Sequence, residues 1–165
     1  MPGHQWLTAR FWGRAADFRS IRRHLMADQG TPGASASGQL FCAFEQRHQC
    51  LLPADVKSNY AIMNGSHDYT GEQHGWMRFW PIEDWRPAQQ QFPDDTVAGA
   101  LPPHMFVCAD HAYECVYFVI DLGPASATYG TVFGLGATRT GLAAISFLQF
   151  VERVANNSDA LHSYA

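Results

Sequence analysis

The feature that most constrains the fold is the stretch 113–122, which is rich in valine, tyrosine, phenylalanine and isoleucine. β-Branched and aromatic residues favour strands, and Gly123-Pro124 marks the point where such a strand ends. Residues 115–120 are the longest uninterrupted apolar run of the chain. A membrane-spanning helix needs about 18 or more such residues. The stretch therefore predicts a β-strand, and the sequence predicts no membrane span.

Three further segments have strand character. Residues 75–80 alternate tryptophan and arginine with methionine and phenylalanine, which is the period of two typical of a strand. Residues 105–109 and 130–135 are short and mostly apolar, and they predict two more strands. Residues 88–103 are polar and rich in proline, and they predict a long loop.

Helices are predicted on both sides of these strands. Apolar residues at helical spacing predict helices over residues 6–27, 39–48, 53–63 and 142–156, with a short helical turn inside 81–87. Asn64-Gly65 ends the third helix, and Ser146 caps the last one if that helix starts late. Helices, then strands, then a helix predict an α+β domain. We expect a basic N-terminal helix and linker over 1–37, the domain over 38–156 and a tail over 157–165.

Charge is distributed unevenly along the chain, although the total is only −4. Residues 1–30 contain five arginines and two aspartates, which gives a net +3, whereas residues 60–125 contain nine acidic residues and two arginines, a net −7. The acidic balance argues against nucleic acid as the partner. Two interpretations of the acidic segment remain open: a solvated surface, or a patch that selects a basic protein. We expect the basic first helix to pack on the domain with its arginines toward water; the alternative is a membrane-surface helix.

One spacing suggests metal chemistry. His104-x3-Cys108-x2-His111-x3-Cys115 contains residue types that bind zinc. On an unbroken strand, however, the first pair would point one way and the second pair the other. The simpler interpretation is two buried cysteines and two surface histidines, so we expect no metal site and no cofactor. A small zinc-dependent enzyme that uses these four residues stays as an alternative.

Three of the five tryptophans, Trp76, Trp80 and Trp85, lie close together in the acidic segment. Aromatic side chains can stack on bases or sugars, but negative charge repels phosphate. Packing in the core or at a protein interface is the interpretation we favour.

These elements occur in an order that resembles the SUKH superfamily, which includes the yeast cell-wall-assembly regulator and many bacterial immunity proteins. The opening is similar at Phe44-Glu45-Gln46-Arg47-His48, at Leu52-Pro53-Ala54-Asp55-Val56-Lys57 and at Asn64-Gly65. The later strands and the closing helix are similar at residues 75–85, 106–122, 131–133 and 144–151. The resemblance spans 38–155, and it implies a mostly antiparallel or mixed sheet with helices packed on it.

The resemblance also implies a function. SUKH proteins are non-enzymatic binding modules, and the bacterial members neutralise toxins, often nucleases or deaminases. We therefore expect a cytoplasmic immunity protein that occludes a basic toxin domain; the alternative is a regulatory scaffold for cell-wall or signalling proteins. The oligomeric state stays open. The residues expected to contact the partner are Glu83, Asp84, Asp94, Asp95, Asp110, Glu114, Trp76 and Trp85.

Overall fold

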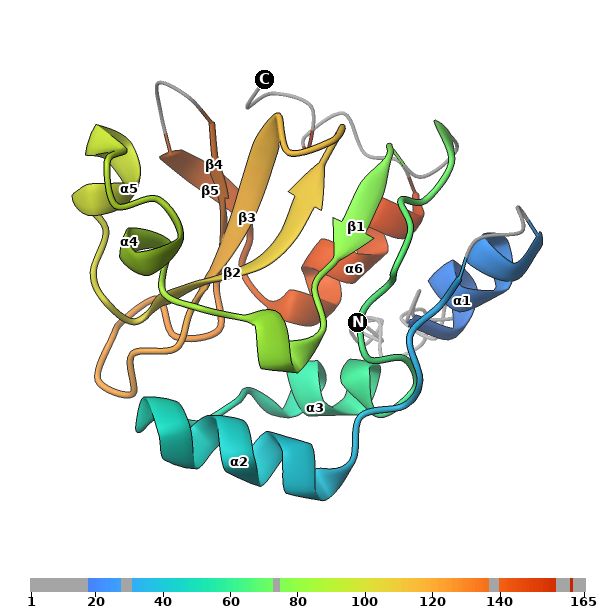
Figure 1. Ribbon diagram of the computed structural model, residues 1–165, viewed down its shortest axis with the longest axis horizontal. Helices are drawn as coiled ribbons and strands as arrows, with labels where there is room; N and C mark the ends of the chain where they lie inside the picture. The colour runs from blue at the N-terminus through green and yellow to red at the C-terminus, as the bar shows by residue number, and fades with distance from the viewer. Residues whose placement is uncertain (1–17, 28–30, 73–74, 137–139, 157–160, 162–165) are drawn as a thin grey trace, which may run out of the picture.

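The computed structural model describes residues 18–27, 31–72, 75–136, 140–156 and 161. A five-stranded antiparallel sheet forms its centre, and the strands are neighbours in chain order (Figure 1). The strands are β1 (Met77–Phe79), β2 (Met105–His111), β3 (Val116–Asp121), β4 (Val132–Leu135) and β5 (Thr140–Ala144). The fold is therefore α+β, as the order of the elements predicts.

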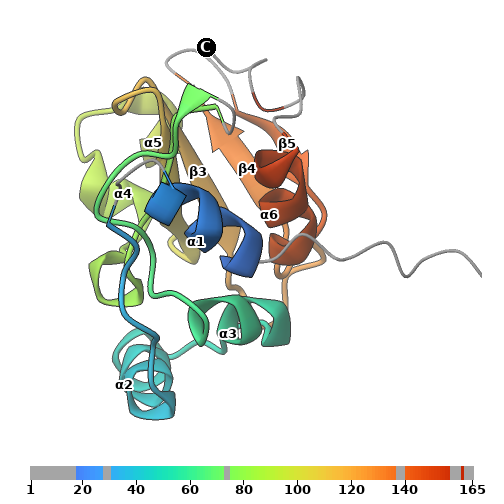
Figure 2. The same ribbon diagram turned by 90° about the vertical axis from the view of Figure 1, so that its right-hand side faces the viewer.

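The helices surround this sheet. They are α1 (Phe18–Ala27), α2 (Gly38–His48), α3 (Ala54–Tyr60), the 3-10 helix η2 (Ile82–Asp84), α4 (Ala88–Gln91), α5 (Thr96–Gly99) and α6 (Phe147–Ala155). Helices α2 and α3 lie together at one end of the molecule in both views, whereas α4 and α5 lie at the opposite side from α1 (Figures 1 and 2). None of the helices among the described residues has the length and apolar character needed to cross a membrane.

One face of the sheet carries the aromatic core. Phe79 of β1 and Phe118 of β3 contact Phe150 of α6, with ring centroids 5.8 and 4.8 Å apart. Phe18 of α1 packs on Phe79 at 4.7 Å and on Phe147 at 5.9 Å. Tilted and edge-to-face pairs of this kind add stability beyond the apolar area that they bury. Helix α1 thus contributes to the core of the domain, while its arginines lie on the exposed side.

The other face of the sheet has a polar row. The strand register places Arg78 opposite Asp110, Asp110 opposite Tyr117, and Tyr117 opposite Leu135. Phe92, which follows α4, covers Tyr117 with ring centroids 4.5 Å apart. This face therefore holds the charged groups that the candidate site uses.

Side-chain caps fix where the helices begin. Ser37 Oγ accepts the Leu40 amide at the start of α2, and Ser146 Oγ accepts the Gln149 amide at the start of α6. Asp55 Oδ2 accepts the Leu148 amide at 2.9 Å, which ties α3 to the first turn of α6. Ser146 caps the last helix because that helix starts late.

Asn64-Gly65 connects the helical half to the sheet. Asn64 Oδ1 accepts the Ile82 amide at 3.0 Å and so holds η2 in place. Gly65 has a φ of +71°, and a Cβ there would lie 2.6 Å from the Pro81 nitrogen. Only glycine fits this left-handed position under the backbone of β1 and η2.

The structure corrects three boundaries. The helix expected to run through Met63 ends at Tyr60, and Met63 is a buried residue after it. Residues 88–103 are not one loop, because they contain α4 and α5, which are too short to give a helical period. Residues 140–144 form β5 rather than the start of the last helix, because they pair with β4. Residues 6–17 of the first expected helix and most of the expected tail lie outside the described residues.

Candidate interaction surface

A buried carboxylate organises the polar face of the sheet. Asp110 of β2 is fully buried, and it accepts hydrogen bonds from Arg78 Nε at 2.8 Å and from Trp80 Nε1 at 2.6 Å. The Tyr69 hydroxyl donates to its other oxygen. A buried charge is tolerated when it is paired and hydrogen-bonded. The side chain of Asp110 is thus fixed by three donors, two from β1 and the residue that follows it and one from Tyr69.

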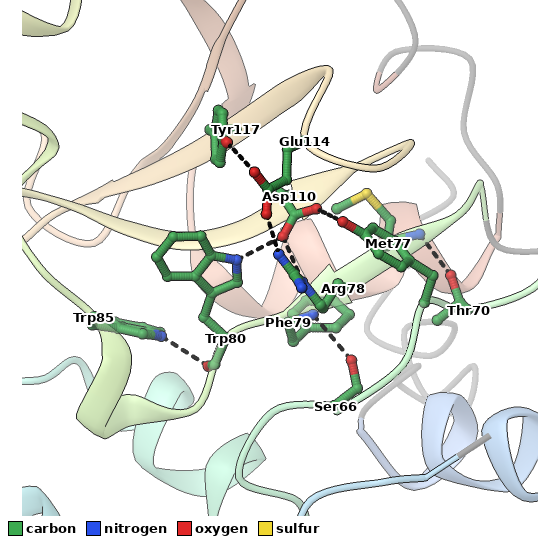
Figure 3. Close-up of polar contacts among 11 residues, drawn as sticks. Ser66, Thr70, Met77, Arg78, Phe79, Trp80, Trp85, Asp110, Glu114 and Tyr117 are labelled. Atoms are coloured by element: carbon green, nitrogen blue, oxygen red, sulfur yellow. Dashed lines mark hydrogen bonds and ion pairs between the residues drawn. The ribbon is translucent and has the colours of Figure 1, made fainter. Parts of the chain in front are cut away.

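The network continues to the surface through Arg78. Arg78 Nη2 lies 2.9 Å from Glu114 Oε1, and the Tyr117 hydroxyl donates to Glu114 Oε2 at 2.9 Å (Figure 3). Burial and the hydrogen bond to Glu114 raise the pKa of Tyr117, and burial and the bond to Asp110 do the same for Tyr69. Both tyrosines therefore stay neutral donors at neutral pH, and Glu114 is held in one orientation.

An aromatic platform, defined as Tyr69, Trp76 and Tyr113, lies beside this network. The ring centroids of Tyr69 and Tyr113 are 4.5 Å apart, and those of Trp76 and Tyr113 are 6.2 Å apart. The guanidinium carbon of Arg78 lies 5.0 Å from the Tyr69 centroid. Tyr113 is 68% exposed and Trp76 is 41% exposed. Exposed large aromatic side chains of this kind are typical of protein interfaces.

A small groove opens next to Glu114. Its volume is about 190 Å³, and its walls come from the α4–α5 segment, from the β2–β3 hairpin and from β4. Asp95 and Glu114 supply carboxylates, while Phe92, Tyr117 and Leu135 supply apolar surface. We call this cavity the acidic groove; its residues are Phe92, Asp95, Glu114, Cys115, Tyr117, Leu135 and Gly136.

A protein-family model for the SMI1 / KNR4 family (SUKH-1) matches residues 36–160. The chain belongs to the SMI1/KNR4 family. The match begins after α1 and covers all the strands and α2 to α6. It confirms the resemblance that the sequence motifs predict. A comparison with curated protein sequences finds no match.

Two of the residues expected to contact a partner are buried in the interior of this SMI1/KNR4 domain. Trp85 is 2% exposed, and its indole donates to the Trp80 carbonyl at 3.0 Å. Asp110 is fully buried in the network described above. Their side chains therefore support the surface and are not themselves accessible to a partner. The exposed residues of the expected set are Glu83, Asp84, Asp94, Asp95, Glu114 and Trp76.

The exposed acids do not form one cluster with a common role. Asp95 Oδ1 caps α5 by accepting the Val97 and Ala98 amides, each at 2.8 Å. Glu83 accepts from the Asn64 side chain at 2.7 Å. Asp84 lines a separate cavity of about 310 Å³, which also contains arginines. Only Asp95 and Glu114 share the acidic groove.

Sequence reasoning missed Arg78, Tyr69 and Tyr113. The alternation of residues 75–80 placed Arg78 on the opposite face from Met77 and Phe79, and that was the signal available for it. The partner of Arg78 becomes visible only with the strand register, which sets Arg78 opposite Asp110.

The four residues with zinc-ligand spacing do not form a metal site. Cys108 is buried at a β-bulge with Sγ 3.4 Å from the Phe118 carbonyl, and His104 lies 3.5 Å from Asp121. The expectation of two buried cysteines and two surface histidines is wrong for Cys115 and His111. Cys115 is exposed in the hairpin loop, and His111 is buried opposite Met77 on the core face. Across the described ranges, no three His, Cys, Asp or Glu side chains come together in a way that could hold a metal ion.

Proposed function

We propose that this SMI1/KNR4 domain is a non-enzymatic, immunity-type binding protein that neutralises a basic toxin domain of the nuclease or deaminase type. The observation that carries the proposal is the acidic groove beside the aromatic platform. Nucleases hold phosphate with arginine and lysine. A groove with two carboxylates and an apolar floor suits such side chains, because their long stems are apolar and their ends are charged.

The carboxylates of the groove are held before any partner arrives. Glu114 is fixed by Arg78 and Tyr117, and Asp95 is fixed by the amides of α5. Fixed groups lose less conformational entropy on binding, so they contribute more affinity than mobile ones. The surrounding acids, Asp94 among them, would speed the encounter with a positive partner.

The proposal is tested by isolating the partner and assaying its activity. The tagged chain is used to capture proteins from source-cell lysate at low and high salt. Each stoichiometric partner is then purified and assayed for nuclease or deaminase activity with and without the chain. We expect a basic partner, released at high salt, whose activity is lost at a 1:1 ratio. A partner from cell-wall synthesis or signalling, or one whose activity is unchanged, would contradict the proposal.

Matched charge variants test whether the acidic side makes the contact. In the double variant Asp94→Asn and Asp95→Asn the cap of α5 is preserved, because asparagine caps helices as well as aspartate. Its control, Glu152→Lys on α6, changes the net charge by the same amount on the other face of the sheet. We expect the double variant to slow association roughly tenfold at low salt and the control to leave it nearly unchanged. Equal effects would show that only total charge matters.

A further inference from the structure

Four residues with a left-handed backbone conformation lie together at the aromatic platform, and two of them belong to it. Trp76, Ala112, Tyr113 and Glu114 have φ values of 52°, 50°, 57° and 70°. They are joined by a hydrogen bond of 3.0 Å from the Ala112 amide to the Trp76 carbonyl. Residues with side chains rarely adopt this conformation, and glycine or asparagine adopts it with less strain. The only other non-glycine residue with positive φ among the described residues is Gln49, at the end of α2.

Three of these residues are consecutive and form the tip of the β2–β3 hairpin. The tip presents the Tyr113 ring against both Tyr69 and Trp76 while Glu114 reaches back to Arg78. A glycine at 113 would remove strain but would also remove the ring. Strained backbone is concentrated at functional sites, where it holds side chains in place. The strain therefore points to a use for the exposed ring, which at 68% exposure adds little to the core.

The chain shows what kind of group suits this platform. The Arg78 guanidinium already lies 5.0 Å from the Tyr69 centroid, which is the geometry of a cation–π contact. The rings of Tyr113 and Trp76 next to it are exposed. Glu114, at 54% exposure, supplies a carboxylate beside them. An aromatic surface with an adjacent carboxylate complements a cationic, planar group.

We propose that Trp76 and Tyr113 receive an arginine side chain of the protein partner, with Glu114 as its counter-ion. This inference rests on the proposed function and names the contact that such a partner makes. Arginine fits better than lysine because its planar guanidinium stacks on rings and pairs with a carboxylate at the same time. Such a contact would be a hot spot of the interface, because the residues that contribute most of the binding energy are most often tryptophan, tyrosine and arginine.

The first test uses peptides on the full chain. The probes are acetyl-Gly-Arg-Gly-Arg-Gly-amide and its lysine and glutamate counterparts, followed by NMR of the Trp76 indole N–H and the Tyr113 amide. We expect saturable shifts at both signals, at least roughly threefold tighter binding of the arginine peptide than of the lysine peptide, and no shift with glutamate. Equal binding of arginine and lysine, or shifts that avoid both residues, would overturn the proposal.

The second test separates a binding role of Tyr113 from a structural one. Tyr113→Gly relieves the left-handed strain, so it should raise the unfolding temperature while it weakens arginine-peptide binding by about tenfold. Gln49→Gly is the matched control, because Gln49 is also left-handed with a φ of 51° and lies on α2 rather than in the hairpin. It should raise stability and leave binding unchanged. Peptide binding that survives Tyr113→Gly would refute the proposal, as would a variant that is destabilised.

The failure of this inference and the failure of the proposed function give different results. If the isolated partner binds Tyr113→Gly and Trp76→Ala as tightly as the wild type, the partner is recognised elsewhere: the inference fails and the function stands. If the arginine peptide binds at Trp76 but the partner's activity is not inhibited, the contact is supported and the toxin function fails.

Discussion

Replacing Asp110 with alanine should lower the free energy of unfolding by about 2–4 kcal/mol. The largest contribution comes from the Trp80 indole, which is buried and would lose its acceptor at a cost of about 1–3 kcal/mol. Arg78 loses less, about 0–1 kcal/mol, because its side chain is 27% exposed and keeps Glu114. The Tyr69 hydroxyl adds a smaller term, because Tyr69 is only partly buried.

Asp110→Asn keeps the shape and lets the network survive in part. Its amide oxygen can accept from Arg78 and Trp80, and its amide nitrogen can donate to the Tyr69 hydroxyl. Asparagine should therefore cost about 1–2 kcal/mol, less than alanine, because mainly the charge is lost. The exposed Asp94→Ala is the control and should change stability by less than about 0.5 kcal/mol.

Urea unfolding followed by circular dichroism measures these values, and for a chain of this length the alanine variant should melt roughly 5–15 °C lower. A double-mutant cycle with Arg78→Met isolates the ion pair. If Asp110 and Arg78 act together, the alanine cost should fall by about 0.5–1 kcal/mol in the Arg78→Met background. A cost below about 0.5 kcal/mol, or equal costs in the two backgrounds, would refute the assignment of Asp110 as the organiser of this face.

Three further predictions follow from single contacts. Iodoacetamide at pH 8 should modify the exposed thiols of Cys42 and Cys115 first, because burial and the Glu45 charge raise the pKa of Cys50 to about 11; mass spectrometry of proteolytic peptides locates the modified thiols. Ser146→Ala removes the cap of α6 and should cost about 1 kcal/mol in urea unfolding, with Ser146→Asp restoring most of it. Stability should fall as pH rises above about 10, because the unfolded chain releases the proton of Tyr69 before the folded chain, in which its pKa is raised; unchanged melting temperature between pH 9 and pH 11 would contradict this.

The central strands were predictable because their residues combine strand propensity with burial. Residues 113–122 contain β3, and residues 105–109 lie within β2. The edge strand β5 was not predictable in the same way. Thr140–Ala144 contains a glycine and two alanines, which are depleted in strands, and its apolar residues continue the helical spacing of α6. What makes it a strand is pairing with β4, a long-range effect that local propensity does not include.

The sequence predicted that the site is acidic, but it did not predict which acidic side chains are exposed. Counting acids identified the segment that contains Asp95 and Glu114, but the same count placed Asp110 on the surface. Every residue of β2 is buried, because the strand lies inside the sheet with both faces covered, so β2 has no alternation that marks Asp110 as special. The role of Asp110 follows from the strand register, which places this residue opposite Arg78. The left-handed tip at Tyr113 has no sequence signal at all, because neither glycine nor asparagine occurs there.

Arg78 explains why the core network and the exposed platform belong to one structure. Its Nε is bound to the buried Asp110, its Nη2 is bound to the exposed Glu114, and its guanidinium covers Tyr69. A partner that contacts Glu114 or Tyr113 thus meets groups that the interior of the sheet already holds in place. Binding then needs little reordering of this surface, which favours affinity. The same coupling means that a substitution at Asp110, a residue no partner can touch, should weaken binding as well as folding, since Arg78 would keep its ion pair with Glu114 but would lose the buried partner that fixes the orientation of that pair.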